Sequence, residues 1–209
     1  MGKLTLTQFV TLDGVYQGPG GPEEDRRNGF EHGGWTVPYA DEDFGRFVTE
    51  VFDRVDAFLL GRRTYEIFAG YWPKITDPAN PIASKLNSLP KYVASSTVTQ
   101  PEWSNTTVLA GDLEKEVADL KERTEGEVQI HGSGALAQSL LALELIDTVH
   151  LLTFPVVLGS GFRLFARGLV PTAFRHAGGR ITSRGVSIQS YELEGRPTYG
   201  SFDLPENLG

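Results

Sequence analysis

The chain has 209 residues, of which 40% are hydrophobic and 22% charged, values typical of a globular protein with one sizeable core. Its net charge of −8 argues against general nucleic-acid binding, because the phosphate backbone requires a basic surface. The absence of cysteine excludes disulfides and thiolate metal sites, and the four histidines show no metal-ligand spacing. We therefore expect a single domain over residues 1–209 that binds neither metal nor nucleic acid.

The amino terminus lacks the apolar stretch of a secretory signal peptide. No run of the sequence approaches the roughly 18 apolar residues that span a bilayer. Residues 3–10 instead alternate polar and apolar side chains, which predicts a first strand. We expect a cytoplasmic protein without membrane contact.

The remaining elements follow from apolar periodicity and from glycine and proline breaks. After the first strand we expect a helix from Asp41, a strand at 57–60, helices at 62–69 and 82–87, strands at 91–96 and 106–110, a helix after Asp112, a strand at 128–131, a helix at 135–143 and a strand at 148–157. Residues 174–181 and 186–193 predict a hairpin, and 198–202 are a candidate end to it. This order predicts an α/β fold with a mainly parallel sheet and an antiparallel C-terminal hairpin.

A glycine-rich turn follows the strand at 128–131 and opens the next helix. Glycine lets a ligand approach the backbone, and the N–H groups of a helix start suit phosphate. The turn fits G-x-G-x-x-A, but residues 149–154 hold no acidic side chain for a ribose hydroxyl, so a phosphate cradle is favoured over a Rossmann fingerprint. An ordinary packing turn is the alternative. The turn consists of Gly132, Ser133, Gly134, Ala135 and Leu136.

A second strand-to-helix junction contains Gly61, Arg62, Arg63 and Thr64. Adjacent helix residues point about 100° apart, so we expect one arginine to face a ligand and the other to face solvent. Two solvated surface arginines are the alternative. Two junctions of this kind predict a dinucleotide, and the arginines predict one with an extra phosphate.

The segment from 12 to 40 is rich in glycine and proline. It is longer than a loop that only joins two secondary-structure elements usually is. Asp13 stands in an Asp-Gly pair, which usually forms a turn, yet a carboxylate at a strand end can also contact substrate. Trp35 and Tyr39 either pack internally or bind a planar ring. We expect this segment to close over the substrate as a lid, with a surface insertion that does not contact the site as the alternative.

Several blocks in order resemble the dihydrofolate reductase superfamily, most closely the C-terminal reductase domain of bacterial riboflavin-biosynthesis deaminase/reductases and their stand-alone relatives. The blocks are 11–14, 60–66, 92–96, 130–136 and 154–161. The resemblance implies a three-layer α/β/α dihydrofolate reductase-like fold and NADPH as hydride donor. It also implies a homodimer, for which the apolar strands at 149–157 and 186–193 would form the interface.

The resemblance also assigns roles to individual residues. The turn from Gly61 to Thr64, together with Ser95 and Ser96 at a strand end, would hold the side of the adenosine 2′-phosphate. The turn from Gly132 to Leu136 would hold the pyrophosphate. Phe9 and Tyr16 would border the nicotinamide.

The substrate is where the sequence departs from the folate-reducing members, which carry Trp-x-x-Pro-x-Asp. Here Ala40 stands at the place of the acid and Asp41 follows it, about 100° further around a helix. We therefore expect an NADPH-dependent reductase of a small heterocyclic, carbonyl or imine substrate, similar to 5-amino-6-(5-phosphoribosylamino)uracil reductase. Asp13, Asp41 or a water would deliver the proton, and Trp35 and Tyr39 would bind the substrate. The alternative is a non-catalytic NADP(H)-binding module.

Overall fold

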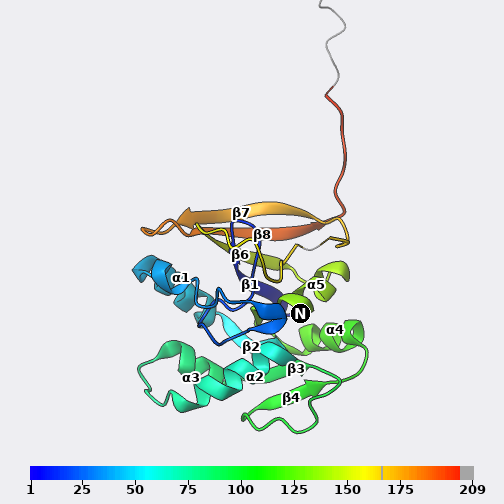
Figure 1. Cartoon of the computed structure of the whole chain (residues 1–209). Helices are drawn as coiled ribbons and strands as arrows, with labels where there is room; N and C mark the ends of the chain where they lie inside the picture. The colour runs from blue at the N-terminus through cyan, green and yellow to red at the C-terminus, as the bar shows by residue number, and fades with distance from the viewer. Residues whose placement is uncertain (166, 203–209) are drawn as a thin grey trace, which may run out of the picture.

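A computed structural model describes residues 1–165 and 167–202 of the protein. These residues form one eight-stranded sheet in the order β4-β3-β2-β5-β1-β6-β8-β7 (Figure 1). The strands are β1 (Lys3–Thr11), β2 (Val55–Gly61), β3 (Lys91–Ala94), β4 (Thr106–Leu109), β5 (Glu127–His131), β6 (Thr148–Phe154), β7 (Ala173–Ile181) and β8 (Ser187–Gly195).

The sheet is parallel from β4 through β6 and antiparallel where β8 joins β6 and β7 joins β8. The predicted mainly parallel sheet with a C-terminal hairpin is therefore confirmed. Two predicted strand ends are wrong. Pro155 has no N–H for the ladder, so β6 ends at Phe154 instead of 157. Residues 198–202 form no strand, because β8 ends at Gly195 with a φ of 96° and Pro197 follows.

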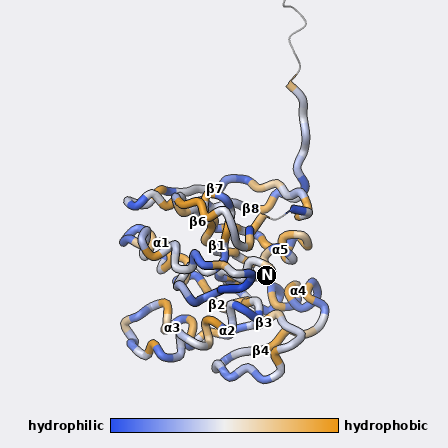
Figure 2. Tube along the Cα trace, viewed as in Figure 1, coloured by the Kyte–Doolittle hydropathy of each residue, from blue (hydrophilic) through white to orange (hydrophobic). Residues whose placement is uncertain are grey.

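Helices cover both faces of the sheet and produce the three layers. On one face, α1 and α3 pack against Phe58 and Leu60 of β2. On the other face, α4 and α5 pack against Leu4, Leu6 and Leu59, and Figure 2 shows hydrophobic residues on α5 and β6. The helices are α1 (Glu42–Asp53), α2 (Arg62–Tyr71), α3 (Pro81–Ser88), α4 (Leu113–Arg123) and α5 (Gly134–Ala142), with 3₁₀ turns at Arg27–Gly29, Val37–Tyr39 and Trp72–Lys74.

Four apolar residues of the strands suggested as a dimer interface are buried within the chain itself, whereas Val157 is 63% exposed. Val149, Leu152, Val186 and Ile188 are each at most 4% exposed. Their hydrophobicity is explained by the core of one protomer, and the homodimer stays a prediction from the resemblance. Among the described residues, every helix is too short or too polar to cross a membrane.

Asp41 caps α1 and ties it to the turn between β7 and β8. Its carboxylate accepts hydrogen bonds from the Phe44 N–H at 2.8 Å, and from the Ser183 hydroxyl and the Arg184 N–H, each at 2.9 Å. These bonds, that of Phe44 first, lower the pKa of Asp41 to about 2. A carboxylate held ionised in this way joins two elements of the fold and cannot supply a proton at neutral pH.

We expect Asp41→Ala to lower the melting temperature more than Asp112→Ala does. Asp112 caps α4 through Lys115 alone, so its loss should cost about 2–4 °C, whereas Asp41 also holds the hairpin turn. Because the pKa of Asp41 is depressed from 3.8 to about 2, its stabilisation is present above pH 3.8 and is lost as the pH falls through 2. Calorimetric melts of both variants across this pH range would contradict the assignment if the two losses were equal.

Candidate functional site

A cavity of about 1430 Å³ opens at the carboxyl ends of the parallel strands. Its wall includes Gln8 and Phe9 from β1, Gly61 from β2, Ala94 from β3 and His131 from β5. In open α/β sheets this end of the strands is where ligands bind. The volume exceeds the roughly 300–1,000 Å³ of a pocket for one drug-sized molecule, so the cavity has room for a dinucleotide with a small molecule beside it.

Two helix starts at this cavity have no side-chain cap. Helix α2 follows Gly61, which has no side chain, and α5 follows Ser133, whose side chain does not bond the first turn of α5. In contrast, α1, α3 and α4 are capped by Asp41, Asn80 and Asp112. The first N–H groups of α2 and α5 therefore remain available for an anion, and the helix dipoles favour negative charge there.

The glycine turn before α5 has the backbone conformation that the sequence predicts. Gly132 and Ser133 have φ values of 65° and 57°, in the region that glycine adopts without strain. A Cβ on Gly134 would lie 2.4 Å from the Tyr16 ring, so glycine is required for that ring to rest on the helix start. The Ser133 hydroxyl accepts a hydrogen bond from the Gly61 N–H at 3.0 Å and so joins the two turns.

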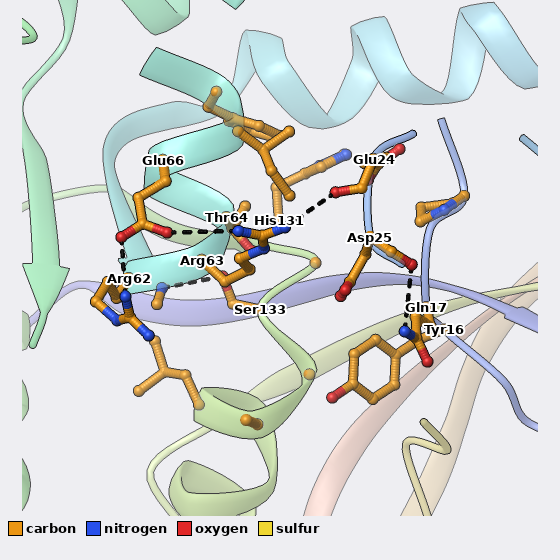
Figure 3. Close-up of a pocket in the computed structure, with 18 of the residues that line it drawn as sticks. Tyr16, Gln17, Glu24, Asp25, Arg62, Arg63, Thr64, Glu66, His131 and Ser133 are labelled. Atoms are coloured by element: carbon orange, nitrogen blue, oxygen red, sulfur yellow. Dashed lines mark hydrogen bonds and ion pairs between the residues drawn. The ribbon is translucent and has the colours of Figure 1, made fainter. Parts of the chain in front are cut away.

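Both predicted arginines lie on the cavity wall, and Glu66 lies between them (Figure 3). Glu66 pairs with Arg62 at 3.0 Å and with Arg63 at 3.8 Å. Arg63 also donates to the Glu24 carbonyl at 3.4 Å, which links α2 to the loop after β1. Both side chains turn towards the same acid and both line the cavity, so which of the two would face a ligand stays a prediction. Glu66, three and four residues further along the helix, is a partner that helical spacing alone could have indicated.

The cavity wall includes every residue predicted to bind the cofactor. The structure brings together residues that lie far apart in the sequence, from β1, the loop after it, and the ends of β2, β3 and β5. These residues are Phe9, Tyr16, Gly61, Arg62, Arg63, Thr64, Ser95, Ser96, Gly132, Ser133, Gly134, Ala135 and Leu136.

Asp13, predicted as a catalytic acid, lies off the cavity wall and forms a structural turn. Its carboxylate accepts from the Thr11 hydroxyl at 2.6 Å and from the Gly159 N–H at 2.9 Å, and it pairs with Arg163 at 3.1 Å. Burial opposes ionisation, but the hydrogen bonds outweigh it and lower the pKa of Asp13 to about 2. The geometry therefore does not support a proton-donor role for Asp13, and the same reasoning applies to Asp41.

Trp35 and Tyr39, predicted to bind substrate, also lie off the cavity wall. Trp35 is 6% exposed, donates from its indole to the Gln17 carbonyl at 2.8 Å, and packs edge-on against Phe154. Tyr39 packs on the same ring and contacts the Pro155 carbonyl at 3.4 Å. The aromatic pair anchors the long segment in the core instead of presenting a face to substrate.

The long segment nevertheless reaches the cavity, through Tyr16, which the sequence singled out, and through neighbours that it did not. The stretch 16–25 and Arg27 line the wall. Gln17 fixes this stretch, because its amide donates to the Asp25 and Arg27 carbonyls at 3.2 and 3.0 Å. Burial raises the pKa of Glu24, against hydrogen bonds from the Gly20 and Gly21 backbone. Glu24 is thus a carboxyl on the cavity wall whose pKa burial raises above its ordinary value.

Comparison with known proteins gives a consistent family and fold. The family described as the RibD C-terminal domain matches residues 2–188. YyaP, an uncharacterized protein of Bacillus subtilis, is 30% identical over 166 residues, which are 78% of this chain and 80% of that protein.

Two solved structures show the same fold at low sequence identity. A Thermotoga maritima diaminohydroxyphosphoribosylaminopyrimidine deaminase/5-amino-6-(5-phosphoribosylamino)uracil reductase is similar with a TM-score of 0.61 and 15% identity, over 92% of this chain and 56% of that one. Dihydrofolate reductase from Enterococcus faecalis, complexed with NADP(H), is similar with a TM-score of 0.56 and 14% identity, over 92% of this chain and 96% of that one. The predicted dihydrofolate reductase-like fold is therefore confirmed.

We expect Ser133→Ala to destabilise the junction between the two turns. Loss of the hydroxyl leaves the Gly61 N–H without its partner and should lower the free energy of unfolding by about 1 kcal/mol. Ser133→Gly removes the same bond but relieves the left-handed backbone at this position, so it should cost less. Urea unfolding of the two variants measures the difference, and an alanine variant as stable as the natural protein would show that this bond is unimportant.

Proposed function

The chain belongs to the RibD C-terminal domain family, and from this premise we propose that it is a reductase that uses NADPH to reduce a small planar heterocyclic, carbonyl or imine substrate. The observation that carries the proposal is the pair of uncapped helix starts on one cavity, next to two arginines. The N–H groups of the two helix starts and the two guanidinium groups lie on the same cavity, which fits a ligand with several phosphates.

The residues on the wall would hold different parts of NADPH. Arg62, Arg63 and Thr64 at the start of α2, with Ser95 and Ser96, would hold the 2′-phosphate. The start of α5 would hold the pyrophosphate through backbone N–H groups, and Phe9 and Tyr16 would border the nicotinamide. When bound, NADPH supplies a hydride.

The protein's own residues would orient the substrate, exclude water and deliver a proton. The loop stretch 16–25 forms one wall and would shield the reacting groups from solvent. Glu24 takes the role that the sequence suggested for Asp13 and Asp41. It lies on the wall, and burial raises its pKa, which is the direction of shift that a general acid needs.

Two names among the similar structures support the proposal. The Thermotoga protein is named as a 5-amino-6-(5-phosphoribosylamino)uracil reductase, and the Enterococcus enzyme is complexed with NADP(H). Both are distant in sequence, so support for the substrate class of this chain comes from its cavity.

We expect NADPH to bind at least about tenfold more tightly than NADH, because a charge-assisted hydrogen bond to the 2′-phosphate contributes about 1.5–3 kcal/mol. The double variant Arg62→Gln/Arg63→Gln should remove this preference and leave NADH binding unchanged. Arg46→Gln is a matched control, since Arg46 also pairs with an acid on its own helix, Asp43, but lies off the cavity wall. Fluorescence titration measures all the dissociation constants, and equal values for the two cofactors in the natural protein would sink the assignment.

Turnover separates a reductase from a module that only binds cofactor. We expect NADPH absorbance to fall when the protein is given a pyrimidine, pterin or dicarbonyl substrate from a screened set. Glu24→Gln should then lower kcat by about 100-fold or more while NADPH affinity is unchanged. A protein that binds NADPH tightly but consumes none across the screen would favour the non-catalytic module.

A further inference from the structure

His131 is the last residue of β5 and lies on the cavity wall directly before the glycine turn. Its ring is enclosed by Phe9 from β1, Phe52 from α1 and Phe68 from α2, with ring centres 5.3, 5.6 and 6.0 Å away. Each of these neighbours is apolar, and burial among them lowers the pKa of His131 to about 4. The imidazole is therefore neutral at physiological pH.

The two ring nitrogens of His131 have different surroundings. Nδ1 is buried and has no hydrogen-bond partner among the described residues. Nε2 is neither buried in this way nor bonded to any residue that the structure describes, so it is the nitrogen that faces the cavity. Because Nδ1 has no partner that could accept a proton from it, we assign the proton of the neutral ring to Nε2, where a ligand could accept the hydrogen bond. His131 thus presents one neutral N–H donor to the cavity.

Two other histidines of the chain already have hydrogen-bond partners. His150 Nδ1 lies 2.7 Å from the Ser190 hydroxyl, and His176 Nε2 lies 2.8 Å from Gln189 Oε1. Both lie off the cavity wall. Nε2 of His150 is likewise buried without a partner among the described residues, so what sets His131 apart from these two is its place on the cavity wall, where a ligand can reach it.

An aromatic wall extends away from His131 along the same cavity. Phe9, Phe68 and Trp72 all line it, and the rings of Phe68 and Trp72 are 6.1 Å apart. Aromatic faces of this kind bind flat rings, with polar groups at the ring edge left to find hydrogen bonds. The donor at His131 is at the end of this wall, next to the turn before α5.

We propose that His131 is a specificity-determining residue whose Nε2–H donates a hydrogen bond to a carbonyl oxygen or ring nitrogen of a planar heterocyclic substrate lying against Phe9 and Phe68. This inference rests on the proposed reductase function and names the substrate group that the site recognises. A site that offers one neutral donor selects against flat molecules without an acceptor at that edge. When such a molecule displaces water, the N–H loses its hydrogen bond to water and gains none in return.

The test is the binding of 5-amino-6-(5-phosphoribosylamino)uracil, a planar pyrimidine with ring carbonyls, to the protein loaded with NADP⁺, measured by titration calorimetry. His131→Phe should weaken binding of the pyrimidine by at least about fivefold. His131→Gln keeps an N–H donor and should stay within about twofold of the natural protein. His176→Phe, on the exposed outer strand, is the matched control and should change nothing.

The affinity for NADP⁺, measured in the same titrations, reports whether each variant is folded. Equal pyrimidine binding by the natural protein and His131→Phe would overturn the role of His131. NADP⁺ binding without any pyrimidine binding would overturn the substrate class named here and leave the reductase proposal standing, whereas failure to bind NADP⁺ would overturn the reductase proposal itself. Nitrogen NMR of the histidine rings adds an independent readout, since a charged ring or an Nδ1–H ring at His131 would also overturn the inference.

Discussion

The candidate site depends on one hydrogen bond, from the Gly61 N–H to the Ser133 hydroxyl, between residues 72 positions apart. It holds the start of α2 against the start of α5. Both helix starts are uncapped for simple reasons. Gly61 has no side chain, and the Ser133 hydroxyl bonds the other turn instead of its own helix. The bond that positions the two helices therefore leaves their N–H groups free for an anion.

Charge is distributed around this junction in a way that the net charge of −8 conceals. Glu66 keeps Arg62 and Arg63 on the wall, although pairs as exposed as these contribute little to stability. Asp13 and Asp41 are held ionised by backbone and hydroxyl donors and join distant loops. Asp13 and Asp41 thus hold the fold, Glu66 orients the arginines, and Glu24 is one of the acids that line the cavity.

The long segment after β1 shows how one local pattern permits two outcomes. An aromatic residue in a glycine-rich stretch can cover a substrate or anchor the stretch, and the residues around it in sequence do not distinguish these. Trp35 is buried because Phe154, the last residue of β6, supplies its packing partner. That anchoring lets the neighbouring stretch 16–25, which carries no obvious motif, form the cavity wall.

The sequence alone determined the parts that local chemistry controls. Apolar periodicity predicts the strand and helix order, and glycines followed by helix formers predict the two turns, since backbone freedom and helix starts are properties of neighbouring residues. Tertiary structure decided the roles of individual polar side chains. Asp13 meets Leu158 across 145 positions and Asp41 meets Ser183 across 142, and the enclosure of His131 requires rings from three elements. Burial and hydrogen-bond partners set the protonation and availability of such groups, and those partners are brought together only by the folded chain.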